Sequence, residues 1–197
     1  MCFAGKRGTI LTGTNMSGKS TFLRTLGINR IFATNLGLAW AESFETDLYF
    51  VMSSIRGEDD RAAGKSRYLV EAERLLLIVE SIKSADPLVL ALIDEILNGT
   101  NSQDRIAASI SILRRAAGKG SIVVAATHDL DIASSLRESY DPRYFCERIE
   151  GERLVFDYTL RDGIVDRKNA LSLLKLIGFG EDLIGDGLVD PEALVPT

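Results

Sequence analysis

One stretch near the start of the chain decides the fold: Thr9-Ile-Leu-Thr-Gly13-Thr-Asn-Met-Ser-Gly18-Lys19-Ser20-Thr21. Its first four residues predict a short strand, and the apolar spacing from Lys19 to about Asn35 predicts an amphipathic helix. The residues between them fit the pattern GxxxxGK[ST] at every position. Glycines at these positions allow successive backbone N–H groups to curl around a phosphate group. We therefore expect a phosphate-binding loop between a strand and a helix.

The residues expected to bind the nucleotide are consecutive. Lys19 is expected to bridge the β- and γ-phosphates of ATP, and the Ser20 hydroxyl is expected to be a ligand of Mg²⁺. The free N–H groups at the start of the helix add the positive end of a dipole. The expected set is Gly13, Thr14, Asn15, Met16, Ser17, Gly18, Lys19, Ser20 and Thr21.

A second GKS sequence, Gly64-Lys65-Ser66, does not form another such loop. Asp59 stands where the first glycine of the pattern would fall, and no buried strand leads directly into it. The pattern therefore occurs once in this chain.

Two acids follow a buried strand. Leu88 to Ile93 form a continuous apolar run, as expected for a strand that is covered on both faces, and Asp94 and Glu95 come next. Open α/β sheets bind their ligands at the carboxyl ends of the strands. We expect Asp94 to hold Mg²⁺ through its water shell and Glu95 to polarise the water that attacks the γ-phosphate. The alternative is an acidic pair that caps the next loop.

His128 is the only histidine of the chain. It follows the apolar run Ser121 to Ala126, which predicts another buried strand, so it is expected at the same sheet edge as Asp94 and Glu95. There its imidazole could donate a hydrogen bond to the γ-phosphate and report its presence. The alternative is a histidine with a structural role only.

The remaining pattern alternates short apolar runs with amphipathic stretches, which indicates an α/β fold with a mainly parallel sheet flanked by helices. We expect one domain over residues 1–165, and a C-terminal helical extension with a tail over residues 166–197. The further elements expected are a strand from Asp47 to Met52, helices from Ser66 to Ser84 and from Ser102 to Ala117, an edge β-hairpin made of Tyr144 to Ile149 and Arg153 to Leu160, and a last helix from about Arg167 to Ile177.

The composition argues against a membrane protein and against direct binding of DNA by this chain. An apolar fraction of 46% and a charged fraction of 26% are typical of globular domains, and the longest apolar run is too short for a membrane span. The net charge is −5 with no basic stripe, so this chain alone is a poor candidate for contact with DNA. Cys2 and Cys146 form neither a CxxC pair nor a disulfide framework, which favours a reducing, cytoplasmic location.

Four segments together resemble one family. Thr12 to Arg24 resembles the pattern TGPNMxGKSTxxR, Leu92 to Asn101 resembles LxDExxxGT, Ala126-Thr-His-Asp129 resembles ATHxx, and Gly64 to Glu71 is similar to GxSxFxxE. These are the patterns of the C-terminal ATPase domain of the MutS family, within the ABC-type P-loop ATPases. The resemblance spans about Thr9 to Ile177, nearly the whole chain.

The resemblance implies a dimer, either of two copies or with a paralogue, with two ATP sites that each partner completes for the other. It implies that Ser66 reaches the γ-phosphate bound to the partner, and that Asn98, Gly99 and Thr100 run along the interface. A plain N-cap for Ser66 and a simple turn for Gly99-Thr100 are the alternatives. It also implies DNA-binding domains, which are missing here, so we expect the chain to be a fragment.

Two hypotheses for the function remain. The first is an ATP hydrolase whose dimer closes and opens around ATP, and so drives domains that bind mismatched or otherwise structured DNA. The second is an ATP-gated dimerisation module with negligible turnover; the presence of both Glu95 and His128 favours the first. A transporter subunit, a GTPase and a P-loop kinase are disfavoured, because the sequence has no LSGGQ-like stretch, no NKxD motif and no assignable arginine lid.

Overall fold

The computed structural model describes residues 6, 8–14, 16–55, 67–84, 86–97, 102–117, 120–150 and 153–165. The chain divides into two compact units, residues 1–146 with 158–165, and residues 147–157 with 166–197. The expected domain boundary after residue 165 coincides with the end of the described residues, so it stays a prediction. The expected helix from Arg167 to Ile177 also lies outside the described residues.

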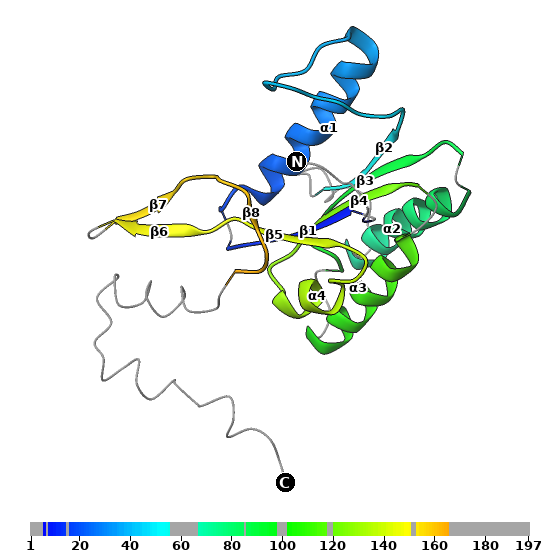
Figure 1. The fold of residues 1–197 in the computed structure, drawn as a ribbon. Helices are drawn as coiled ribbons and strands as arrows, with labels where there is room; N and C mark the ends of the chain where they lie inside the picture. Colours follow the sequence, from blue (N-terminus) through cyan, green and yellow to red (C-terminus); the bar gives the residue numbers. More distant parts are fainter. Residues whose placement is uncertain are drawn as a thin grey trace. The chain divides into compact units, whose positions relative to one another are not determined.

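A six-stranded sheet forms the centre of the first unit (Figure 1). Its strand order is β2-β3-β4-β1-β5-β8; neighbouring strands are parallel from β2 to β5, and β8 is antiparallel to β5. This confirms the mainly parallel α/β sheet that the sequence predicts. The strands are β1 (Gly8–Thr12), β2 (Phe50–Ser54), β3 (Val89–Asp94), β4 (Ile122–Ala126), β5 (Asp141–Tyr144) and β8 (Arg161–Asp162).

Helices flank this sheet on both faces, as expected. The apolar residues of α1 pack with one set of strand residues, and those of α2, α3 and α4 pack with the other set. The helices of this unit are α1 (Lys19–Leu36), α2 (Arg67–Ser84), α3 (Ser102–Ala116) and α4 (Leu130–Ser135).

Strand β3 shows why both faces are covered. Its residues alternate between the two cores, because successive side chains of a strand point to opposite faces. Leu90 and Leu92 pack on the α1 side, whereas Val89, Ala91 and Ile93 pack on the side of the other helices. All five are buried, and each large one contributes about 1.5–3 kcal/mol of burial free energy. This packing fixes the strand whose end carries Asp94 and Glu95.

The predicted hairpin forms, but it does not belong to the sheet that was expected. β6 (Glu147–Glu150) and β7 (Arg153–Phe156) pair antiparallel in a two-stranded sheet of their own, within the second unit. The prediction that the hairpin forms an edge of the main sheet is therefore wrong. The strand that pairs with β5 at that edge is the two-residue β8.

Several other boundaries differ from the expectations. β2 begins at Phe50 rather than Asp47, and α4, β5 and β8 are short elements that the sequence pattern did not predict. Among the described residues, no helix combines the length and the apolar character that crossing a bilayer requires.

Candidate functional site

The loop between β1 and α1 is built on two glycines with left-handed backbone. The φ angle of Gly13 is 144° and that of Gly18 is 106°. A Cβ atom on Gly13 would lie 2.6 Å from the carbonyl oxygen of Phe145 and 2.8 Å from Oγ of Ser17, closer than real Cβ atoms come. The loop therefore needs glycine at position 13 for both its conformation and its packing.

Lys19 is held over this loop at the start of α1. Its Nζ donates hydrogen bonds to the carbonyl oxygens of Gly13 and Thr14, each at 2.8 Å, and the residue is 5% exposed. Beside it, Oγ of Ser17 is buried without a hydrogen-bond partner. A buried ammonium and an unsatisfied hydroxyl, together with the N–H groups that have no partner within the first turn of α1, form an arrangement that fits a phosphate anion.

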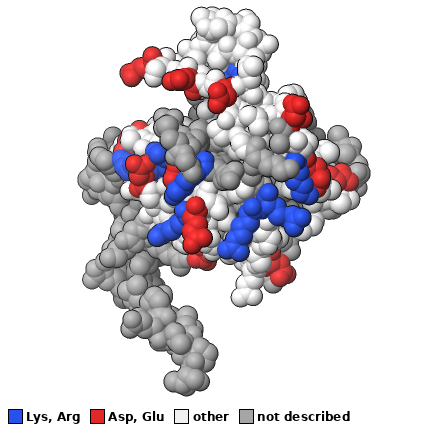
Figure 2. Space-filling view, turned by 45° about the vertical axis from the view of Figure 1, so that its right-hand side comes forward, with Lys and Arg blue, Asp and Glu red and all other residues white. Residues whose placement is uncertain are grey.

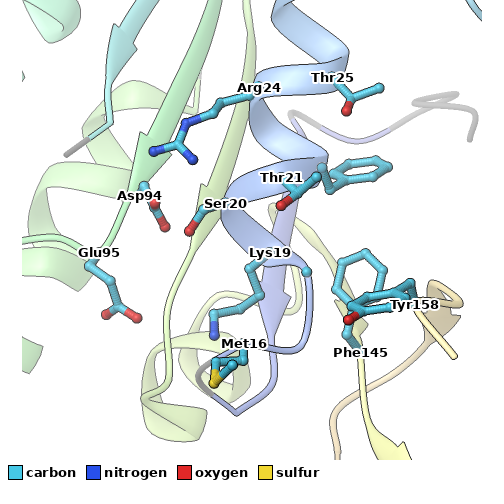
Figure 3. A pocket seen from close by; sticks show the side chains of 12 residues that line it. Met16, Lys19, Ser20, Thr21, Arg24, Thr25, Asp94, Glu95, Phe145 and Tyr158 are labelled. Atoms are coloured by element: carbon cyan, nitrogen blue, oxygen red, sulfur yellow. The ribbon is translucent and has the colours of Figure 1, made fainter. Parts of the chain in front are cut away.

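The two predicted acids lie opposite this loop. Asp94 ends β3 and is 7% exposed. Figure 3 shows its carboxylate facing the Ser20 hydroxyl, with the Glu95 carboxylate directed into the same cleft. Within the described ranges, no three His, Cys, Asp or Glu side chains gather as a metal site. One hydroxyl and one carboxylate fit Mg²⁺, which keeps several waters and takes phosphate oxygens as further ligands.

Glu95 is held in an unusual conformation by β4. Its φ angle is 58°, a left-handed value, and its backbone N–H donates to the carbonyl oxygen of Ala126 at 2.9 Å. Its Oε2 lies 2.9 Å from Nδ1 of His128. The structure therefore brings the two predicted catalytic residues together. His128 does not line the cleft, however, and its side chain is 45% exposed, so its contact with a γ-phosphate stays a prediction.

The loop and the acids line one cleft of about 700 Å³. Its lining also includes five residues that were not predicted as nucleotide contacts: Phe22, Arg24, Thr25, Phe145 and Tyr158. Arg24 is the last fixed position of the glycine-loop pattern, whereas no fixed position of a motif marks the other four.

Tyr158 lines this cleft on the opposite side from Glu95 (Figure 3). The Tyr158 side chain lies beside Gly18, where a Cβ atom would come within 3.1 Å of the tyrosine ring, and the residue is 63% exposed. An exposed aromatic face next to a phosphate-type loop is suited to stack on a base.

Asp129 follows His128 and forms a pair that the sequence analysis also missed. Its carboxylate lies 3.1 Å from Nη2 of Arg105 on α3, and 3.8 Å from Nε2 of His128. His128 therefore lies between two carboxylates, those of Glu95 and Asp129.

Five of the predicted site residues lie outside the described residues: Asn15, Ser66, Asn98, Gly99 and Thr100. Of the remaining loop residues, Met16, Gly18, Ser20 and Thr21 line the cleft, while Thr14 contributes its carbonyl oxygen to Lys19.

Comparison with known proteins identifies the relatives of this chain. The family model described as MutS domain V matches residues 9–188. The DNA mismatch repair protein MutS of Thermotoga sp. (strain RQ2) is 30% identical over 184 residues, which cover 91% of this chain and 23% of that protein. The proteins of the same name from Thermus thermophilus and Streptococcus mutans are 27% and 28% identical, over 89% and 94% of this chain and 21% and 22% of their own lengths.

These findings correct the identification made from the motifs. The motifs resemble those of an ATPase domain within the ABC-type P-loop ATPases. The family that matches is described as MutS domain V, and the comparisons show no ABC-type or P-loop ATPase identity. The likeness to MutS remains, and the chain spans less than a quarter of the curated relatives it matches.

Proposed function

The chain belongs to the MutS domain V family, and from this premise we propose that it binds ATP with Mg²⁺ and hydrolyses the nucleotide in the cleft described above. One observation carries the proposal: the glycine loop with its buried Lys19 faces Asp94 and Glu95 across a single cleft (Figure 3). An anion cradle opposite two acids is the arrangement that phosphoanhydride hydrolysis requires.

Different residues of the cleft would bind different parts of Mg·ATP. The loop N–H groups and Lys19 would bind the β- and γ-phosphates, and the aromatic face of Tyr158 would lie against the base. Ser20 and Asp94 would hold Mg²⁺, which neutralises charge that develops on the phosphate oxygens.

Glu95 is the proposed general base. Its carboxylate is directed into the cleft, and its backbone is fixed by the hydrogen bond to Ala126. His128 would orient this carboxylate by donating a hydrogen bond from Nδ1–H to Oε2, which requires the proton of the imidazole on Nδ1. A water held between Glu95 and the γ-phosphate would be polarised for attack.

The wider task of the protein is also a proposal. We infer a dimer of two copies or with a paralogue, completed around ATP, with Ser66 and the segment of Asn98, Gly99 and Thr100 acting across the interface. DNA would be bound by domains outside this sequence, since Lys and Arg on the face shown in Figure 2 are interspersed with Asp and Glu and the net charge is −5. Mismatch repair is the task named for the relatives, and mismatched or other structured DNA is the proposed target.

A second candidate is an ATP-gated dimerisation module that turns over negligibly. The observation in its favour is that one carboxylate oxygen of Glu95 is already hydrogen-bonded to His128, which leaves only the other oxygen for a water. The two candidates differ in one measurement, the release of phosphate from bound ATP in a single turnover.

Replacement of Lys19 tests the proposal. Lys19→Ala should weaken binding of ATP at least ~100-fold, because a buried charge that contacts two phosphates is removed. Lys83→Ala, which removes an exposed lysine paired with Glu80 on α2, is the matched control and should bind ATP like the wild type. Equal ATP affinity in Lys19→Ala and the wild type would refute the assignment of this cleft. If the wild-type protein binds ATP but releases no phosphate, the second candidate is favoured.

A further inference from the structure

A second cavity lies at the other end of α1 from the glycine loop. It has a volume of about 520 Å³, is open to solvent, and lies between α1 and the segment that follows it, residues 37–48. In Figure 1 this segment runs from the upper end of α1 back towards β2. The cavity shares no lining residue with the nucleotide cleft, so it is a separate site.

Arg30 is the charged residue of α1 in the wall of this cavity. It is only 3% exposed, and its Nε is fully buried without a hydrogen-bond partner. Within the described part of the chain its guanidinium makes no ion pair. Burial of a guanidinium is unfavourable unless its charge is paired and its N–H donors are hydrogen-bonded. An anion bound in the cavity would supply both to Arg30.

The rest of the wall restricts which anion fits. The lining is mixed: Leu38, Phe44 and Leu48 are its large apolar members, with Ala33, Ala39 and Ala41 between them, and Thr34, Ser43 and Thr46 add hydroxyl groups. Three carboxylates also border the cavity, those of Glu42, Glu45 and Asp47. Their negative charges disfavour a doubly charged phosphate, and Arg30 disfavours an amine.

The charges of Asp47 and Arg30 both act on the phenol of Tyr49. Burial raises its pKa, the charge of Asp47 raises it further, and the charge of Arg30 lowers it. The charges of Arg30 and Asp47 therefore act on the same side chain, in opposite directions.

We propose that this cavity binds a single carboxylate carried on a short apolar body, with the carboxylate paired to Arg30. A guanidinium binds a carboxylate through two parallel hydrogen bonds, which would satisfy the buried donors. The apolar part of the lining, Leu38, Phe44 and Leu48, would cover the body of the ligand, and a volume of about 520 Å³ is within the range of small-molecule sites. The carboxylate belongs either to a small acid or to an Asp or Glu side chain of an apolar protein segment.

Trp40 provides a reporter for this site, because its chain neighbours Ala39 and Ala41 both line the cavity. It is the only tryptophan of the chain, it is 83% exposed, and its backbone N–H donates to Oδ1 of Asn29 at 2.6 Å. The covering segment is thus attached to α1 one residue before Arg30. Filling the cavity should change the environment of Trp40 and therefore its fluorescence.

The experiment is a titration of the full chain with hexanoate, followed by Trp40 emission at constant ionic strength. Hexanoate should give a saturable change with a midpoint of about 1–10 mM, the range that so small a ligand reaches. Hexylamine and hexanol should give no saturable change. A peptide with blocked ends, Leu-Leu-Glu-Leu-Leu, forms the second arm: saturation by the peptide at lower concentration than hexanoate assigns the site to a protein segment, and the reverse order assigns it to a small acid.

Arg30→Met keeps the length of the side chain and removes its charge. This variant should raise the midpoint for hexanoate at least ~10-fold while its thermal midpoint of unfolding stays level or rises, because an unpaired buried charge is lost. Arg115→Met removes an exposed arginine of α3 and should bind like the wild type. The proposal is overturned if neither carboxylate ligand saturates the wild type, or if Arg30→Met binds hexanoate as the wild type does. Because the readout does not involve ATP, Lys19→Ala should respond to hexanoate normally, whatever the fate of the proposed ATPase.

Discussion

The Glu71 carboxylate on α2 accepts a hydrogen bond from the backbone N–H of Leu97, in the turn that follows Asp94 and Glu95. Both Glu95 and Leu97 have left-handed backbone, with φ angles of 58° and 54°. Such a conformation costs about 1–2 kcal/mol per residue when the side chain is not glycine. Glu71 therefore stabilises a strained turn whose shape determines where the Glu95 carboxylate points.

We expect Glu71 to be a positioning residue for hydrolysis. Glu71→Leu should lower kcat about tenfold, since the loss of a hydrogen bond of about 1.5 kcal/mol relaxes the turn, while the Kd for ATP stays within about twofold of the wild type. Glu71→Gln keeps an acceptor oxygen and should recover most of the rate. Steady-state kinetics together with ATP titration measure both quantities. Equal loss of kcat in the Gln and Leu variants would show that the acceptor oxygen has no such role.

Glu95→Gln tests the general base. The amide keeps the size of the side chain but cannot take a proton, so kcat should fall at least ~100-fold with ATP binding retained. His128→Ala should lower kcat less, and the double variant should be no slower than Glu95→Gln within roughly threefold, because residues that act as one unit are not additive. Single-turnover phosphate release measures all three variants. A double variant whose losses multiply would mean that His128 acts independently of Glu95.

The sequence was sufficient to predict the elements with strong local signals. The buried run Leu88 to Ile93 and the glycine loop before α1 are both found where expected, because apolar continuity and the chemistry of glycine are local properties. Strand β5, with the sequence Asp141-Pro-Arg-Tyr144, has no apolar run, and it becomes a strand only because it pairs with β1. The hairpin was found from its alternation, but alternation does not say which sheet a hairpin joins.

In the candidate site, too, residues with a local sequence signal could be predicted, and residues that reach the site through tertiary packing could not. Lys19, Asp94 and Glu95 could be found because each belongs to a motif with fixed spacing. Tyr158 and Phe145 could not be found as cleft residues, since they reach it through tertiary packing and no spacing marks them. Glu71 was noticed only as part of a pattern, and its hydrogen bond to Leu97 depends on how α2 packs beside β3.

Gly8→Ala tests the packing of β1 against β4. A Cβ atom at Gly8 would lie 1.8 Å from the carbonyl oxygen of Val123, and the φ angle there is 147°. We expect a loss of about 3 kcal/mol or more in the free energy of unfolding, or about 6–12 °C in Tm. Gly163→Ala is the matched control: its φ angle is 101° but no atom lies within 4 Å, so it should lose only about 1 kcal/mol. Similar Tm values for the two variants would contradict the close approach of β1 and β4.

We expect two chains to close around ATP, with Ser66 of each chain at the interface with the other. The Glu95→Gln protein should form dimers when saturated with ATP, because bound nucleotide is retained, and Ser66→Arg in that background should keep it monomeric by placing a bulky side chain at the proposed interface. Ser84→Arg is the control, since Ser84 is exposed at the far end of α2, which is about 27 Å long. Light scattering with and without ATP gives the mass. Dimers that survive Ser66→Arg, or that Ser84→Arg disrupts equally, would exclude a site completed by Ser66 of the partner.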